Sequence, residues 1–168
     1  MKSIIDVNQT IRDMAAGIRD LDLENPLVVG IHTGGVWVAN RLHEHLGLAE
    51  SPATLDISFY RDDFSRVGLN PEVKSSELPM DIDERNIILV DDVLYTGRTI
   101  RAAMNEILSY GRPSMIRLCV LAERSGRELP VQADIVGCSL DLAEYEQARL
   151  SCRKDKLTLT IVTTGTDE

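Results

Sequence analysis

The chain has 168 residues, 43% of them hydrophobic, and a formal net charge of −9 at pH 7. This length and apolar content predict one globular domain with a full-sized core, and no apolar run reaches the roughly 18 residues that a membrane-spanning helix needs. The acidic excess disfavours a constitutive nucleic-acid-binding surface, because phosphate backbones bind where basic residues gather on one face.

The first half of the sequence alternates helical and extended patterns. Apolar residues at helical spacing predict an opening amphipathic helix: Val7, Ile11, Met14, Ile18 and Leu21. Residues 27–31 predict a buried strand, and a second helix follows until Gly47. Residues 54–60 alternate apolar and polar side chains, which is typical of a strand with one wetter face.

The second half completes an α/β pattern. Residues 61–84 are rich in charge and poor in large apolar groups, which predicts a flexible lid loop. An apolar strand leads into a helix with Ile100, Ala103 and Ile107 on one face, and later strands are expected at 116–121, 133–136 and 157–162. We expect a single domain over residues 1–168, with a parallel-sheet core flanked by helices and a small C-terminal subdomain.

The three cysteines, Cys119, Cys138 and Cys152, are an odd number without Cys-x-x-Cys spacing. Neither a disulfide framework nor a zinc site is indicated. The N-terminal residues lack the apolar core and cleavage site of a signal peptide. These features favour a reduced cytoplasmic protein with no membrane segment.

The most informative stretch is residues 87–99, in which an apolar strand runs into Asp91 and Asp92. A loop with two threonines and a glycine follows, and a helical pattern then begins. Loops at the carboxyl ends of parallel strands bind ligands, and backbone N–H groups at a helix start hold phosphates. The carboxylates can accept hydrogen bonds from sugar hydroxyls, so this corner suits a phosphorylated ribose. In a regular strand they would point to opposite faces, so gripping one sugar requires a bend.

The same corner is also compatible with purely structural roles. An acidic pair after a strand can cap a helix, and Thr-Gly-Arg-Thr can be an ordinary turn. A Walker phosphate loop is excluded, because its glycine spacing and its Gly-Lys-Ser/Thr ending are missing. Residues 30–35 form a second glycine-rich turn between a strand and a helix, which can approach an anion closely or serve only tight packing.

The string Asp-Asp-Val-Leu-Tyr-Thr-Gly-Arg-Thr at 91–99 resembles the phosphoribosyl pyrophosphate (PRPP) signature of type I phosphoribosyltransferases. More narrowly, the chain resembles the PyrR family, which combines pyrimidine-operon regulation with uracil phosphoribosyltransferase activity. Four further segments carry this resemblance: residues 27–35, 56–63, 110–114 and 127–130. It implies a type I phosphoribosyltransferase fold and synthesis of UMP and diphosphate from uracil and PRPP with Mg²⁺. It also implies a homodimer or a dimer of dimers.

The resemblance assigns roles to individual residues. Catalytic roles fall to Asp91, Asp92 and Arg61, and the two aspartates would also hold Mg²⁺ through water and PRPP. Diphosphate binding falls to Thr33, Gly34 and Gly35, and the base ring would lie against Glu123 and Arg124. The remaining substrate-binding residues follow the acidic pair: Val93, Leu94, Tyr95, Thr96, Gly97, Arg98 and Thr99. Without the resemblance, Arg61 and its acidic neighbours would be interpreted as solvated surface charge.

Two departures from related sequences bear on chemistry. Better-known PyrR proteins carry Lys and Arg where this chain has His32 and Gly34. Diphosphate neutralisation then depends on Mg²⁺, on Arg61 and on protonated His32, and a scaffold that holds nucleotide without catalysis becomes a further hypothesis. Purine-salvage relatives place Asp immediately before their Thr-Gly, where this chain has Tyr95. That replacement removes a charged contact to a purine and favours uracil.

The competing function is a UMP-sensing regulator that binds RNA and attenuates transcription of pyrimidine genes. Positions that tend to be basic or His in RNA-binding family members align here with Gly126, Gln132 and Cys138. These replacements and the acidic charge make RNA the disfavoured partner, so the expected partners are PRPP, uracil and UMP.

Overall fold

The computed structural model describes residues 2–58, 76–79 and 81–165. In chain order the elements are α1 (Val7–Asp20), β1 (Leu27–Ile31), α2 (Gly34–Leu46), β2 (Ala53–Leu55), β3 (Asn86–Leu94), α4 (Arg98–Tyr110), β4 (Met115–Arg124), β5 (Ile135–Leu140), β6 (Glu146–Arg153) and β7 (Lys156–Thr163). The first predicted strand matches β1 from end to end, and the first two predicted helices correspond to α1 and α2.

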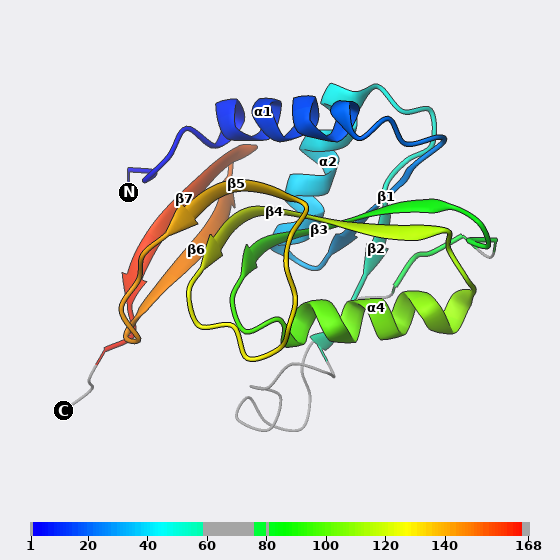
Figure 1. Ribbon diagram of the computed structural model, residues 1–168. Helices are drawn as coiled ribbons and strands as arrows, with labels where there is room; N and C mark the ends of the chain where they lie inside the picture. Colours follow the sequence, from blue (N-terminus) through cyan, green and yellow to red (C-terminus); the bar gives the residue numbers. More distant parts are fainter. Residues whose placement is uncertain (1, 59–75, 80, 166–168) are drawn as a thin grey trace.

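The main sheet has five parallel strands in the order β2-β1-β3-β4-β5. Figure 1 shows α1 and α2 on one face and α4 on the other. The predicted parallel-sheet core flanked by helices is therefore confirmed. From β1 the chain moves outward to β2 and then returns to the other side of β1 as β3. Ligands of open α/β sheets bind outside the carboxyl ends of the strands at such a reversal, so β1 and β3 mark the expected site.

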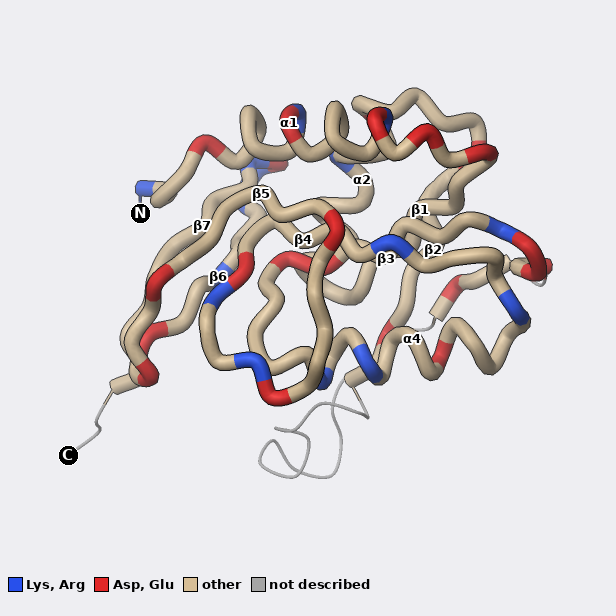
Figure 2. The backbone as a smooth tube through the Cα atoms, in the orientation of Figure 1, with Lys and Arg blue, Asp and Glu red and all other residues tan. Residues whose placement is uncertain are grey.

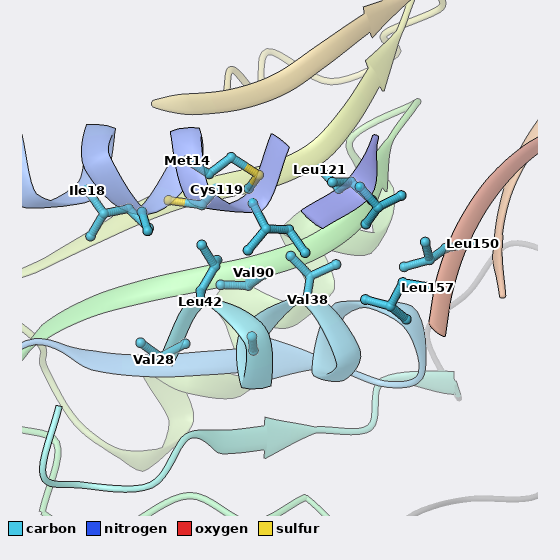
Figure 3. Close-up of a cluster of buried hydrophobic side chains, with 14 of the residues drawn as sticks. Met14, Ile18, Val28, Val38, Leu42, Val90, Cys119, Leu121, Leu150 and Leu157 are labelled. Atoms are coloured by element: carbon cyan, nitrogen blue, oxygen red, sulfur yellow. The ribbon is translucent and has the colours of Figure 1, made fainter. Parts of the chain in front are cut away.

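Two apolar layers hold the helices to the sheet. On one face, α1 and α2 pack against residues of β1, β3 and β4 and of the C-terminal strands, as Figure 3 shows for Met14, Val38, Val90, Leu121 and Leu157. On the other face, α4 contributes a separate buried cluster. The strands are apolar on both faces because both are covered. Their burial fixes the carboxyl ends of the strands in place.

Local signals set the ends of the first two helices. The Asp6 carboxylate accepts a hydrogen bond from the Gln9 backbone N–H at 3.0 Å and caps α1. Gly47 ends α2 in the left-handed conformation with φ 64°, which glycine adopts without a steric penalty.

The strand predicted at residues 54–60 is wrong at residues 56–58, since β2 ends at Leu55. The Asp56 carboxylate accepts hydrogen bonds from the backbone N–H and the hydroxyl of Ser58, at 2.9 and 2.6 Å. This local side-chain turn competes with strand pairing. Residues 59 and 60 lie outside the described residues.

The C-terminal hairpin was only half predicted. Strands β6 and β7 pair antiparallel around a turn at Lys154 and Asp155, both of which have positive φ. Only β7 was expected, at 157–162. The hairpin forms a sheet of its own, and Arg41 of α2 donates to the Asp155 carboxylate at 2.8 Å. This sheet corresponds to the predicted small C-terminal subdomain.

Most of the predicted lid at residues 61–84 lies outside the described residues. In its described part, Glu77 pairs antiparallel with Thr54, with backbone hydrogen bonds of 2.8 and 3.1 Å. Ile82 is fully buried against the α4 layer. These residues are therefore packed against the sheet. Among the described residues, no helix is long and apolar enough to cross a membrane.

Candidate functional site

The acid pair, Asp91 and Asp92, lies within β3 and does not end it. The ladder with β4 pairs Asp91 with Val120 and continues through Leu94. Each carboxylate accepts a hydrogen bond from the backbone N–H of the residue that follows it, at 2.9 Å in both cases. Asp91 is only 4% exposed, whereas Asp92 is partly buried. The strand is thus longer than predicted, and its carboxylates are fixed by their own backbone.

The glycine turn, residues 33–35, joins β1 to the first residues of α2 and lies against the acid pair. A Cβ atom added to Gly34 would lie 2.2 Å from Oδ2 of Asp92, and one added to Gly35 would lie 3.3 Å from Oδ1 of Asp91. Both carboxylates therefore lie beside the same turn. In this arrangement, Asp92 occupies the space that a side chain at position 34 would need.

The threonine loop, residues 95–99, leads from β3 into α4. Gly97 precedes the helix with φ 92°, and its carbonyl accepts the Arg101 N–H at 3.0 Å. The Thr96 hydroxyl accepts the Arg98 N–H at 3.2 Å. A positive-φ glycine followed by a helix N-terminus directs backbone N–H groups outward, an arrangement that suits an anion.

One cavity of about 440 Å³ joins the acid pair to the threonine loop. It is lined by Asp91, Asp92, Val93, Leu94, Tyr95, Thr96, Gly97, Arg98, Thr99, Ile100, Arg124, Gln147 and Ala148. The structure thus brings together the residues predicted at 91–99 and Arg124, with the glycine turn beside the acid pair. Arg61 lies outside the described residues.

Gln147 and Ala148 were missed from the sequence because β6 was not predicted. A weak signal existed: Ala148, Leu150 and Cys152 recur with the period of two that marks a half-buried strand. The two cavity residues come from the start of this strand, so the hairpin forms part of the wall.

Arg124 and Tyr95 form a stacked pair at the cavity. The Arg124 guanidinium carbon lies 4.2 Å from the centre of the Tyr95 ring, a distance typical of a cation–π contact. Arg124 is only 6% exposed and donates to the carbonyls of Ala143, at 3.2 Å, and of Glu146. It therefore ties the hairpin to the threonine loop.

Glu123 lies on a neighbouring cavity rather than on the one that holds the acid pair. That cavity, of about 430 Å³, is lined by Glu123, Arg124, Ser125, Arg127, Ser139, Leu140 and Asp141. The Glu123 carboxylate accepts the Ser139 hydroxyl at 2.9 Å and pairs with Arg127 at 3.6 Å. Arg124 lines both cavities, so the two predicted base contacts have different surroundings.

Two of the three cysteines, Cys119 and Cys138, are unsuited to act as nucleophiles. Burial within the sheet raises the pKa of Cys119 to about 12, and burial also raises the pKa of Cys138. Both thiols are therefore neutral at physiological pH, and a neutral thiol is a poor nucleophile. Cys152 lies on β6, where its side chain packs against the core.

Among the residues that the structure describes, the acid pair supplies the carboxylates that line the cavity. No cluster of three or more His, Cys, Asp or Glu residues could hold a metal ion within the described part of the chain. Two adjacent carboxylates nevertheless offer the hard oxygen ligands that Mg²⁺ prefers, and Mg²⁺ is commonly held by one or two carboxylates together with substrate phosphates. The residues present fit an ion that is completed by water and a phosphorylated ligand.

Comparison with known sequences connects this site to a family of enzymes. A model of the phosphoribosyl transferase domain matches residues 2–148. Bifunctional protein PyrR of Nitrosococcus oceani is 51% identical over 153 residues, which cover 88% of this chain and 86% of that protein. The chain belongs to the PyrR family of phosphoribosyltransferases. Bifunctional protein PyrR of Pseudomonas paraeruginosa is likewise 51% identical, over 82% of this chain and 81% of its own length.

Solved structures support the fold. A hypoxanthine-guanine phosphoribosyltransferase from Bacillus anthracis superposes with a TM-score of 0.67 at 18% identity, covering 87% of this PyrR-family chain and 85% of its own. A hypoxanthine phosphoribosyltransferase from Staphylococcus aureus gives a TM-score of 0.66 at 20% identity, over 84% and 76% of the two chains. The type I phosphoribosyltransferase fold expected from the sequence is confirmed.

Proposed function

We propose that this PyrR-family chain is a Mg²⁺-dependent uracil phosphoribosyltransferase that makes UMP and diphosphate from uracil and PRPP. The observation that carries the proposal is the meeting of the acid pair and the threonine loop on one cavity, with the glycine turn beside the acid pair. A hydroxylated sugar with phosphate at both ends matches these three elements in chemistry and in order.

The proposed roles follow from the charge that develops during ribosyl transfer. As diphosphate departs, the anomeric carbon gains positive charge, and the carboxylates of the acid pair stabilise it while they accept hydrogen bonds from the ribose hydroxyls. Residues 95–99 hold the 5′-phosphate through backbone N–H groups, and the glycine turn receives the diphosphate. These residues form no bond to the substrate, since their work is positioning and electrostatic stabilisation.

Mg²⁺ is the proposed cofactor, held by Asp91 and Asp92 through water and PRPP. When bound with PRPP, it neutralises charge on the phosphate oxygens. The need for such a cation is greater in this chain, because Gly34 contributes no positive charge and His32 contributes one only when protonated. We further propose that Arg61 helps to neutralise the diphosphate and that residues 61–84 close over the site as a lid. Glu123 is proposed as a contact to the base.

Uracil is the proposed base because Tyr95 stands where purine-salvage relatives place Asp. A tyrosine offers no carboxylate at that position to meet a purine nitrogen, and the Arg124 guanidinium stacks on its ring. We expect incubation with PRPP, Mg²⁺ and each nucleobase in turn to yield UMP from uracil alone. Chromatography of the mononucleotides measures this, and a purine nucleotide without UMP would refute the assignment.

The second candidate function is UMP-sensing RNA binding. It is considered because the similar proteins are named bifunctional, which implies a second activity beside the enzyme. The structure offers a reason why a basic residue is missing at one aligned position. Gly126 has φ 113°, and an added Cβ would lie 2.6 Å from the Tyr95 ring. In Figure 2, acidic and basic positions are interspersed along the chain and do not gather on one element in that view. The enzyme therefore remains the first proposal.

We expect this protein to bind the leader RNA of a pyrimidine gene only weakly, because its net charge is −9. Titration of that RNA with UMP present, at two salt concentrations, measures the affinity. Tight binding that weakens as salt rises would instead establish the regulator, since phosphate contacts release counterions. A run of unrelated RNA of equal length is the control.

We also propose that the protein works in the reduced cytoplasm as a homodimer or a dimer of dimers. The unpaired state of Cys119, Cys138 and Cys152 supports the first part. The second part rests on the resemblance to the family.

A further inference from the structure

A supporting segment, residues 125–131, follows β4 and wraps the threonine loop. The Thr96 carbonyl accepts hydrogen bonds from the backbone N–H groups of Glu128 and Leu129, at 2.9 and 3.0 Å. The Glu128 carboxylate also pairs with Arg98 at 3.6 Å. The loop assigned to the 5′-phosphate is therefore hydrogen-bonded to a segment about 30 residues later in the sequence.

The same segment fits the threonine loop by shape. A Cβ added to Gly97 would lie 3.2 Å from the Val131 side chain and 3.4 Å from that of Leu129. The close approach of Gly126 to the Tyr95 ring adds a second contact of this kind. Two positive-φ glycines, one in each segment, thus allow the segments to lie directly against each other.

Arg127 joins the two segments through several contacts at once. Its guanidinium donates to the Tyr95 carbonyl from Nη1 and to the Val131 carbonyl from Nε, the latter at 2.8 Å. Its Nη2 lies 3.6 Å from the Glu123 carboxylate. Only arginine has a planar fork that can serve carbonyls in two directions, because a lysine ammonium is a single point of donation.

We propose that Arg127 is a positioning residue for the 5′-phosphate site. It fixes the backbone at Tyr95, and so sets the direction of the N–H groups that follow, without touching the ligand. This inference rests on the proposed function, because it takes the threonine loop as the phosphate site. From the sequence alone, Arg127 could equally be an ordinary charged surface residue.

The expected result for Arg127→Ala is a rise of about tenfold or more in KM for PRPP, with a similar loss of affinity for ribose 5-phosphate. The phosphate is held alike in the ground state and the transition state, so kcat should change much less. KM for uracil should stay near the wild-type value. Steady-state kinetics and calorimetric titration with ribose 5-phosphate measure these quantities.

Arg127→Lys is the second variant, which keeps the inference testable if Arg127→Ala does not fold. It keeps the charge near Glu123 but cannot make both carbonyl contacts, so we expect a folded protein that still binds ribose 5-phosphate less tightly than wild type. The matched control is Arg117→Ala, at the other end of β4, where Arg117 pairs with Asp134 at 3.1 Å. That control should leave KM for PRPP unchanged.

The outcomes separate the inference from the proposed function. Wild-type protein that makes no UMP from uracil and PRPP overturns the proposed function. Active wild-type protein, with unchanged KM for PRPP in both Arg127 variants, overturns the positioning role. A lower melting temperature with unchanged ribose 5-phosphate affinity overturns it as well, because Arg127 would then serve stability alone.

Discussion

Replacing Asp91 and Asp92 together by asparagine should abolish UMP synthesis while the domain remains folded. The Asn side-chain oxygens can still accept the backbone N–H groups that the carboxylates accept now, at 2.9 Å, so β3 keeps its local bonds. The negative charge beside the anomeric carbon is lost, and removal of such stabilisation costs about 100-fold to 1,000-fold in kcat for a single group. UMP formation from uracil and PRPP with Mg²⁺ measures the loss.

The matched control for the acid pair is Asp13→Asn on α1. That carboxylate is exposed and accepts a hydrogen bond from the Gln9 side chain at 2.9 Å. Asp13 does not line the cavity. We expect it to retain full turnover. Undiminished kcat in the Asp91→Asn, Asp92→Asn protein would remove the acid pair from the mechanism.

Gly34→Ala should lower turnover by about 100-fold, because displacement of a reacting group by about 1 Å has an effect of that size. The added Cβ would lie 2.2 Å from Oδ2 of Asp92 and 2.6 Å from its Cγ, so the carboxylate must move. The overall fold should survive, since the clash is confined to one side chain at the cavity. Kinetics and a thermal melt, recorded on the same preparation, separate the two effects.

The control for Gly34→Ala is Gly47→Ala at the end of α2. An added Cβ there meets nothing within 4 Å, but the φ of 64° strains an alanine. We expect a loss of about 1 kcal/mol of stability with unchanged activity. Full activity in the Gly34→Ala protein would show that Asp92 does not need its present position.

The parts of the site that the sequence predicts are those that depend on neighbouring residues. β1 and residues 87–90 of β3 are apolar runs because both faces of the sheet are covered, and a glycine at or near the start of the next helix follows each strand. Strand, turn and helix start then lie within a dozen residues of one another. The acid pair, the glycine turn and the threonine loop were all found in this way.

The parts that the sequence does not predict depend on contacts between distant segments. β6 reads as Glu-Gln-Ala-Arg-Leu-Ser-Cys-Arg, in which the period-of-two signal is weak and most side chains are small or polar, and the strand is stabilised by pairing with β7. Arg127 looks like surface charge until the Tyr95 carbonyl is brought within reach. The strand predicted at 54–60 is wrong at residues 56–58 because of a local contact. There the Asp56–Ser58 turn overrides the alternating pattern of apolar and polar residues.

The wall supplied by Gln147 and Ala148 has a consequence for biosynthesis. All five strands of the main sheet precede residue 141, whereas the last part of the cavity and the carbonyls that hold Arg124 come from residues 142–148. A ribosome therefore delivers the five-stranded scaffold before it delivers the last wall of the cavity. Ligand capture should begin only once β6 and its partner β7 have emerged, so a newly made chain assembles the five-stranded sheet before it completes the cavity.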